Sequence, residues 1–176
     1  METRLRFESA AQSPEHATDP ATDPATDRVF TFIIDKKTGL CLAQLRSDDD
    51  TWSLTGGLVD YGEEPIEALR RECFEEIGFI PNDLKEIYGS FVRSEHGEDK
   101  YCRIFLATVE DAAQLSLTPC PYEVTALKWV ALDAWPTPLH PEMPKLLNNP
   151  QIISLIREHV RLHPFAQNTA PMANQN

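Results

Sequence analysis

The sequence predicts an α+β fold, an α/β/α sandwich with a mixed sheet, contained in a single domain. Its 176 residues are enough for one well-formed core. Apolar residues make up 41% of the chain and charged residues 25%, a composition typical of globular proteins. Strand-like and helix-like segments follow one another without the regular alternation that would indicate a parallel βαβ sheet.

The first 27 residues are predicted to lie outside the domain. They carry an imperfect Thr-Asp-Pro-Ala repeat at 18–25, whose prolines remove backbone donors and disfavour a helix. Few of these residues are apolar enough to be buried, so we expect a Pro/Asp/Thr-rich disordered linker over 1–27. The folded domain is expected over 28–165, with a flexible C-terminal tail at 166–176.

Runs of aliphatic, β-branched and aromatic residues predict the strands. The run 29–35, the turn Lys37-Thr38-Gly39 and the run 40–46 together predict a hairpin. A short strand is expected at 52–54, immediately before two glycines. Later strands are expected at 84–92, 103–109 and 126–130, with the charged segment 94–99 as a loop.

Two helices are predicted. For the first, expected over 65–77, Pro65 suits the first turn and nearby glutamates suit the positive end of the helix dipole. Gly78 suits the left-handed residue that follows a last turn. The second helix, expected over 151–162, is predicted by aliphatic residues that recur on one face, namely Ile152, Ile153, Ile156 and Val160.

Charge and cysteine content limit the classes of function. The net charge is −12, which argues against non-specific binding to nucleic acid or to an anionic membrane surface. No apolar run approaches the ~20 residues of a spanning helix, and the first residues do not resemble a signal peptide. The four cysteines, at 41, 73, 102 and 120, form no C-x-x-C pair. We expect reduced, mostly buried thiols in a cytoplasmic protein.

The first helix carries an unusual group of acids. At 100° per residue its apolar stripe occupies an arc of about 80°, and Glu72, Glu75 and Glu76 fall within a neighbouring arc of about 100°. Like charges at this spacing destabilise a helix slightly, which a solvated surface tolerates. Clustered carboxylates also suit a hard divalent cation that binds phosphate. Helix geometry alone leaves both interpretations open and favours the solvated surface.

The order of the whole segment favours the metal site. Gly57 is followed after five residues by Glu63, and after seven more by Arg71-Glu72-Cys73-Phe74-Glu75-Glu76-Ile77-Gly78-Phe79. This segment matches every fixed position of the Nudix box, and residues 28–165 resemble one Nudix hydrolase domain. Cys73 fills a position where an aliphatic residue is more usual, and Thr55 stands where many members have proline.

The resemblance implies the family's α/β/α sandwich, with a loop–helix–loop that holds Mg²⁺, or Mn²⁺ in its place, against a diphosphate. Arg71 would orient the carboxylates by ion pairing, and Glu63 would hold the loop. The implied metal ligands are the Gly57 carbonyl and the carboxylates Glu72, Glu75 and Glu76. A bound water would be activated by the metal and deprotonated by a carboxylate.

A further acid is expected from a later segment. Glu123, at the approach to the last strand, corresponds to a metal ligand or general base in some MutT-like members, or is an ordinary loop residue. Glu95, Glu98 and Asp99 lie in a loop where other members keep this acid.

Candidate substrate contacts are fewer. Arg46 ends the second strand, where a planar guanidinium suits phosphate oxygens, and Arg93 and Arg103 are weaker candidates. Phe32, Trp52 and Phe91 could stack on a base, although such residues are more often core. His140 could close a base pocket or be an ordinary loop histidine.

The resemblance predicts Mg²⁺-dependent hydrolysis of a nucleoside diphosphate linked to another group. Residue arrays associated with NADH, ADP-ribose or dinucleoside polyphosphate cleavage are not seen; Glu95, for example, stands where ADP-ribose-cleaving members have proline. Elimination favours a MutT-like nucleoside triphosphate pyrophosphohydrolase, with an ADP-ribose or nucleotide-sugar pyrophosphatase as the alternative. Less favoured are a non-catalytic nucleotide sensor, RNA 5′-end pyrophosphate removal and a prenyl diphosphate isomerase. We expect a small nucleotide as partner and a monomer or homodimer.

Overall fold

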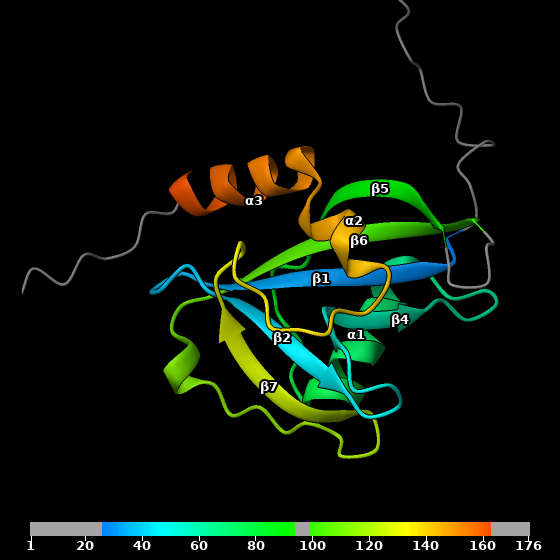
Figure 1. The fold of residues 1–176 in the computed structure, drawn as a ribbon, viewed down its shortest axis with the longest axis horizontal. Coiled ribbons are helices and arrows are strands. Elements are labelled where there is room, and N and C mark those ends of the chain that lie inside the picture. Colours follow the sequence, from blue (N-terminus) through cyan, green and yellow to red (C-terminus); the bar gives the residue numbers. More distant parts are fainter. Residues whose placement is uncertain (1–25, 94–98, 163–176) are drawn as a thin grey trace, which may run out of the picture.

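The computed structural model describes residues 26–93 and 99–162 (Figure 1). Most of the predicted linker, the loop acids Glu95 and Glu98, and the predicted tail lie outside the described residues.

A mixed sheet forms the centre of the described fold (Figure 1). Its path runs β3-β2-β1-β6-β5, with β4 paired to β1 and β7 paired to β2. The pair β1–β6 is parallel and the remaining pairs are antiparallel. The strands are β1 (Arg28–Asp35), β2 (Cys41–Arg46), β3 (Trp52–Ser53), β4 (Thr55–Leu58), β5 (Lys85–Arg93), β6 (Asp99–Val109) and β7 (Val124–Val130).

Helices cover both faces of the sheet. Side chains alternate along β1, so this strand contributes to the core on each face. Phe30, Phe32 and Ile34 share a core with residues of α2 (Met143–Leu147) and α3 (Pro150–Leu162). Val29 and Ile33 face the other way and pack near α1 (Pro65–Ile77). In Figure 1, α3 lies on one side of the sheet and α1 on the other. The predicted α/β/α sandwich is therefore confirmed.

The predicted hairpin forms, but its two strands separate. β1 and β2 pair only next to the turn, at Ile34 and Cys41. Beyond this point β1 pairs with β4, whereas β2 pairs with β3 and β7. Two polar side chains lie between the separated strands, where the Thr55 hydroxyl donates to Oε1 of Gln44 at 3.0 Å. Each is only 1% exposed. The separation thus creates a buried polar position beneath α1.

The first helix has the predicted ends. Pro65 lies in its first turn, and Gly78 takes the left-handed conformation with φ of 65°. The Gly78 N–H donates to the carbonyl of Phe74 at 3.0 Å, which closes the last turn. Its glutamates therefore have the spacing that the sequence predicts.

Some features differ from expectation. Thr26 and Asp27, predicted as linker, are attached to β6: Nε of Arg103 donates to Thr26 Oγ1 at 2.6 Å, and the Tyr101 N–H donates to Asp27 Oδ2 at 2.7 Å. The ordered region therefore begins before Arg28. The strand β4, the short helix α2 and a 3₁₀ turn, η1 (Ala112–Gln114), were not predicted.

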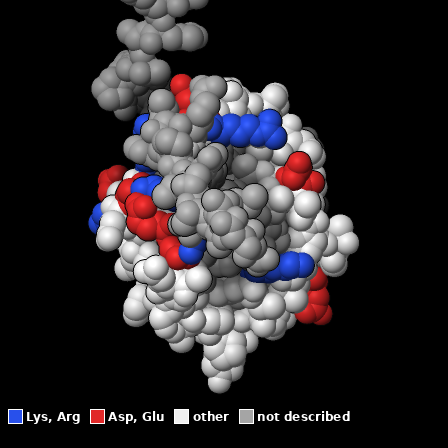
Figure 2. All heavy atoms as spheres, turned by 90° about the vertical axis from the view of Figure 1, so that its left-hand side faces the viewer, with Lys and Arg blue, Asp and Glu red and all other residues white. Residues whose placement is uncertain are grey.

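The surface charges and the cysteines agree with what the composition predicts. On the face in Figure 2, basic side chains of the described residues stand apart from one another, with acidic side chains among them. All four cysteines are free thiols, and Cys41, Cys73 and Cys102 are buried. No helix in the described ranges has the length and apolar character needed to cross a bilayer.

Candidate active site

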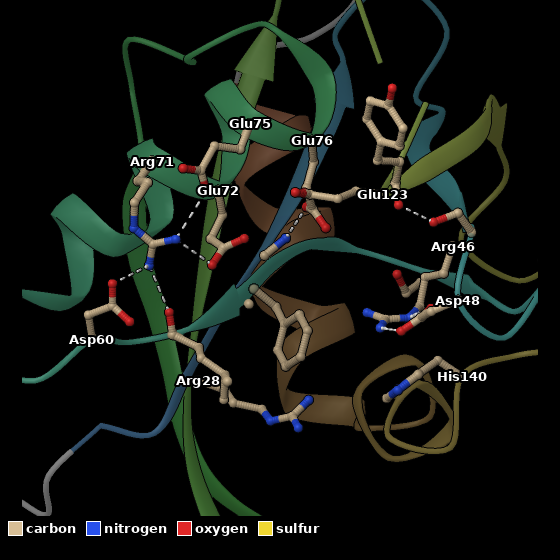
Figure 3. Close-up of a pocket in the computed structure, with 17 residues that line it drawn as sticks. Arg28, Arg46, Asp48, Asp60, Arg71, Glu72, Glu75, Glu76, Glu123 and His140 are labelled. Carbon is tan, nitrogen blue, oxygen red and sulfur yellow. Dashed lines mark hydrogen bonds and ion pairs between the residues drawn. The ribbon is translucent and has the colours of Figure 1, made fainter. Parts of the chain in front are cut away.

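A cavity of about 480 Å³ opens where the hairpin strands separate (Figure 3). Its walls come from the first residues of β1, the end of β2, β3, β4, α1 and two later loops. Carboxylates outnumber guanidinium groups two to one among the residues that line it, so the cavity attracts cations. The lining acids are Asp48, Asp60, Glu72, Glu75, Glu76 and Glu123, and the guanidinium groups are those of Arg28, Arg46 and Arg71.

Glu76 is the most buried of these acids, with 5% exposure. Its carboxylate accepts from the Gly56 N–H at 2.9 Å and from Nε2 of Gln44 at 2.7 Å. Burial raises its pKa to about 8 against the effect of these hydrogen bonds, and the charges of Glu72 and Glu123 raise it further. A cation bound nearby would therefore stabilise the ionised form of the Glu76 carboxylate.

Glu72 fills the space that a side chain at position 57 would occupy. A Cβ built on Gly57 would lie 2.5 Å from the Glu72 carboxyl carbon. Burial raises the pKa of Glu72 against the lowering effect of Arg71, and the negative charges of Glu75 and Glu123 act in the same direction as burial. Only glycine at position 57 allows the carboxylate to approach the strand this closely.

Arg71 connects the acids of the helix to the preceding loop (Figure 3). Its guanidinium donates to both oxygens of Glu63, at 3.1 and 2.9 Å. It also donates to Glu72 at 2.8 Å, to Glu75 at 3.1 Å and to the Leu58 carbonyl at 3.0 Å. The hydrogen bond from Arg71 is the main cause that lowers the pKa of Glu63. Arg71 thus contacts two of the carboxylates that it was expected to orient.

The donor set fits magnesium bound together with phosphate. Across residues 26–93 and 99–162, no three His, Cys, Asp or Glu side chains converge closely enough to hold an ion unaided. Mg²⁺ ordinarily binds one or two carboxylates and completes its shell with water and substrate phosphates. Glu72, Glu75 and Glu76 line one wall of the cavity and offer hard oxygen donors of this kind.

Glu123 is the late acid that lines the cavity. It directly precedes β7, and its carbonyl accepts from the Ser47 N–H at 2.9 Å. Figure 3 shows it across from Glu76 in the same cavity, and its charge contributes to the raised pKa of both Glu72 and Glu76. Asp99 instead is the first residue of β6.

Arg46 lines the cavity, but an aspartate already holds its guanidinium. Nε donates to Asp48 Oδ1 at 3.0 Å, and Nη2 donates to the other oxygen of the same carboxylate. Asp49 lies 3.6 Å from Nε. A phosphate oxygen that reached Arg46 would therefore compete with Asp48.

The aromatic candidates are placed elsewhere. Phe32 has no exposed surface and belongs to the core shared with α3, so the expected stacking role is corrected. Trp52 does not line the cavity. Phe91 is exposed on β5 and packs edge-on against Tyr101, with ring centroids 5.0 Å apart. Arg103 pairs with Glu86 and does not line the cavity.

Sequence reasoning missed Arg28, Phe30 and Ser53, which line the cavity. Phe30 is two residues before Phe32 on the same face of β1, and it lies near the start of the strand, where the cavity is. The available signal was the position of Arg28, a charged residue immediately before the mostly apolar run 29–34.

Glu63→Gln is expected to lower kcat by about 10- to 100-fold, the range for partners that orient ligating groups. The change removes the charge that holds Arg71 and so loosens Glu72 and Glu75. Glu67→Gln is the matched control, because Glu67 pairs with exposed Arg70 on the same helix and does not line the cavity. Steady-state kinetics on a turned-over substrate measure both, and equal effects of the two changes would contradict the orienting role.

Comparison with known proteins adds independent findings. A family model described as NUDIX domain matches residues 24–149. A MutT-like protein from Streptomyces ambofaciens is 31% identical over 84 residues, which cover 48% of this chain and 52% of that protein. A nucleoside triphosphate pyrophosphatase/Nudix hydrolase fusion protein from Bifidobacterium longum (strain NCC 2705) is 39% identical over 59 residues, 34% of this chain and 12% of that protein. The chain thus spans about half or less of these curated relatives.

Among solved structures, the MutT NUDIX hydrolase from Burkholderia pseudomallei aligns with a TM-score of 0.56 and 28% identity. The alignment covers 68% of this chain and 95% of that one. The similarity therefore extends over almost the whole of that protein's fold.

Proposed function

The chain belongs to the Nudix family, and on that premise we propose that it hydrolyses the diphosphate linkage of a nucleoside diphosphate joined to a further group, with Mg²⁺ as cofactor. A nucleoside triphosphate is the favoured substrate, with release of a nucleoside monophosphate and pyrophosphate. ADP-ribose or a nucleotide sugar is the alternative.

The division of the cavity carries this proposal. Glu72, Glu75 and Glu76 form an acidic wall suited to a metal, and Arg46 lines the same cavity with a guanidinium that suits phosphate oxygens. A polyphosphate needs both a metal and a cationic side chain, because its oxygens must be neutralised while its uncleaved part is held in place.

Each residue then has a distinct task. Bound Mg²⁺ would neutralise phosphate oxygens and lower the pKa of a bound water. Glu76, Glu72 and Glu75 would hold the metal, and Arg71 fixes two of these carboxylates by hydrogen bonds. Glu123 is the candidate proton acceptor, because among the described residues its carboxylate has no ion-pair partner. Glu72 and Glu75 are instead paired with Arg71, and both oxygens of Glu76 accept hydrogen bonds.

A substrate panel tests the proposal. The purified protein would be incubated with Mg²⁺ and nucleoside triphosphates, oxidised dNTPs, ADP-ribose, NADH, nucleotide sugars or dinucleoside polyphosphates, and products identified by mass. We expect one class to be turned over, with a nucleoside monophosphate and pyrophosphate from a triphosphate. Turnover must disappear on chelation of the metal.

Other outcomes would change the assignment. Turnover of ADP-ribose or a nucleotide sugar alone would replace the triphosphate assignment with the alternative. Tight nucleotide binding without turnover of any compound would contradict the enzyme proposal and indicate a sensor.

The free thiols support the cytoplasmic location that we propose, because disulfides are rare in that reducing compartment.

A further inference from the structure

Arg28 and His140 line the cavity together with the acids of α1, and both are organised by one buried residue. Nη1 of Arg28 donates to Oε2 of Glu142 at 3.2 Å, and Glu142 is only 2% exposed. The N–H of Glu142 donates to Nδ1 of His140 at 3.4 Å. Glu142 therefore fixes a guanidinium through its side chain and an imidazole through its backbone.

The contact at Nδ1 determines which hydrogen-bonding role His140 can take. Because Nδ1 accepts, the proton of the neutral ring lies on Nε2, which is then a donor. Burial lowers the pKa of His140, and the positive charges of Arg46 and Arg28 lower it further against the raising effect of Glu142 and Asp49, which favours the neutral ring. In Figure 3 the Arg28 guanidinium extends toward His140.

This region of the cavity therefore presents hydrogen-bond donors. A guanidinium has no acceptor, and His140 offers Nε2–H. Asp48 is the carboxylate beside them in Figure 3, and both of its oxygens are engaged by Arg46. A ligand group with acceptors complements such a surface, whereas an amino group would place donor against donor.

We propose that Arg28 and His140 select the uncleaved part of the substrate, favouring a purine with a 6-oxo group over one with a 6-amino group, and that Glu142 positions both side chains. The inference rests on the proposed function, in which the phosphate chain lies against the acidic wall. The base then occupies the remaining part of the cavity, beside Phe30.

The test compares ITP with ATP, whose bases differ in the oxo or amino group at position 6. We expect kcat/KM to be about 10-fold or more higher for ITP, because one good paired contact discriminates by this order. In Arg28→Gln and His140→Phe, the ratio should fall toward one, mainly through a higher KM for ITP. A wild-type ratio of one or below, or an unchanged ratio in Arg28→Gln, would overturn the inference.

The positioning role of Glu142 needs a separate pair of variants. Glu142→Gln keeps an acceptor for Arg28 and should retain most of the preference. Glu142→Leu removes it, so KM for ITP should rise with kcat nearly unchanged. Equal ratios in the wild type and in a folded Glu142→Leu protein would contradict the positioning role. If that variant does not fold, loss of the preference in folded Glu142→Gln would contradict the acceptor role.

Binding separates this inference from the hydrolysis proposal. IMP and AMP would be titrated into the Mg²⁺-loaded protein by calorimetry, which requires no turnover. Tighter binding of IMP, weakened in Arg28→Gln, would support the inference even if no triphosphate were hydrolysed. Equal binding of the two, or binding of neither, would overturn it even if hydrolysis of some other substrate were established.

Discussion

Glu76→Gln is expected to reduce kcat/KM by more than about 100-fold, beyond the loss for a residue that only orients a ligand. The substitution keeps the size of the side chain and removes the charge from the most buried carboxylate of the cavity. Steady-state kinetics with saturating Mg²⁺ measure the effect. Glu67→Gln on the exposed side of the same helix is the control and should retain full activity.

The same variant should be more stable than the wild type without metal. The folded protein raises the pKa of Glu76 to about 8, so the group stabilises the fold below its unfolded pKa of 4.5 and loses that contribution as pH rises through 8. The amide that replaces the carboxylate carries no such dependence, and its oxygen can still accept from the Gly56 N–H. With chelator present, the Tm of the variant should exceed that of the wild type by about 2 °C or more at pH 8.

The difference should become small near pH 4.5, where wild-type Glu76 is protonated in the folded state and half protonated in the unfolded state. Thermal denaturation across this pH range provides the measurement. An equal Tm difference at every pH would show that the buried charge is not its cause. Added Mg²⁺ should raise the Tm of the wild type more than that of the variant, because in our proposal the ion would bind the folded state through this carboxylate.

Two neighbouring glycines should respond to alanine in opposite ways. At Gly56 the backbone has φ of +143°, and a Cβ would overlap the Val29 carbonyl oxygen and lie 2.8 Å from Cα of Phe30. These are backbone atoms of β1, which pairs with β4 at this position. Gly56→Ala is therefore expected to lower the free energy of unfolding by about 3 kcal/mol or more.

At Gly57 the obstacle is the mobile end of a side chain. The nearest atoms to a new Cβ belong to the Glu72 carboxylate, which can move aside without disturbing the strands. Gly57→Ala should therefore keep its stability and lose activity by roughly 100-fold, as for a catalytic group displaced by about 1 Å. Chemical denaturation and kinetics on both variants are the measurements. A stable Gly56→Ala protein, or a fully active Gly57→Ala enzyme, would contradict this account.

Elements with local end signals were predictable from sequence, and elements that depend on a partner were not. Pro65 and Gly78 fix the ends of α1, which spans the residues expected. By contrast, β4 contains Gly56 and Gly57, which disfavour a strand, and it forms because β1 pairs with it. The helix α2 has five residues, too few for a helical period to be visible.

The site divides in the same way. Its acidic wall comes largely from one continuous segment, so its residues could be found by spacing along the helix. Arg28 and Ser53 come from distant segments and meet only after folding, whereas His140 was a candidate from its sequence position and does line the cavity. Phe32 was expected to contact the base, but the residue that lines the cavity is Phe30, two positions earlier on the same face of β1. The sequence does not show which residue of this face lies in the core and which lies at the cavity.

The cavity between the separated hairpin strands draws its proposed metal-binding and recognition residues from different segments, which affects how substrate specificity can evolve. The glutamates that would bind metal lie on α1, whereas Arg28 and His140 lie at the start of β1 and in the loop before α2. Substitutions in those two segments can alter which molecule enters while the hydrolytic apparatus stays intact. An ancestral scaffold of this design could acquire new substrates by drift in the recognition segments alone, and an engineer could exchange those segments between relatives.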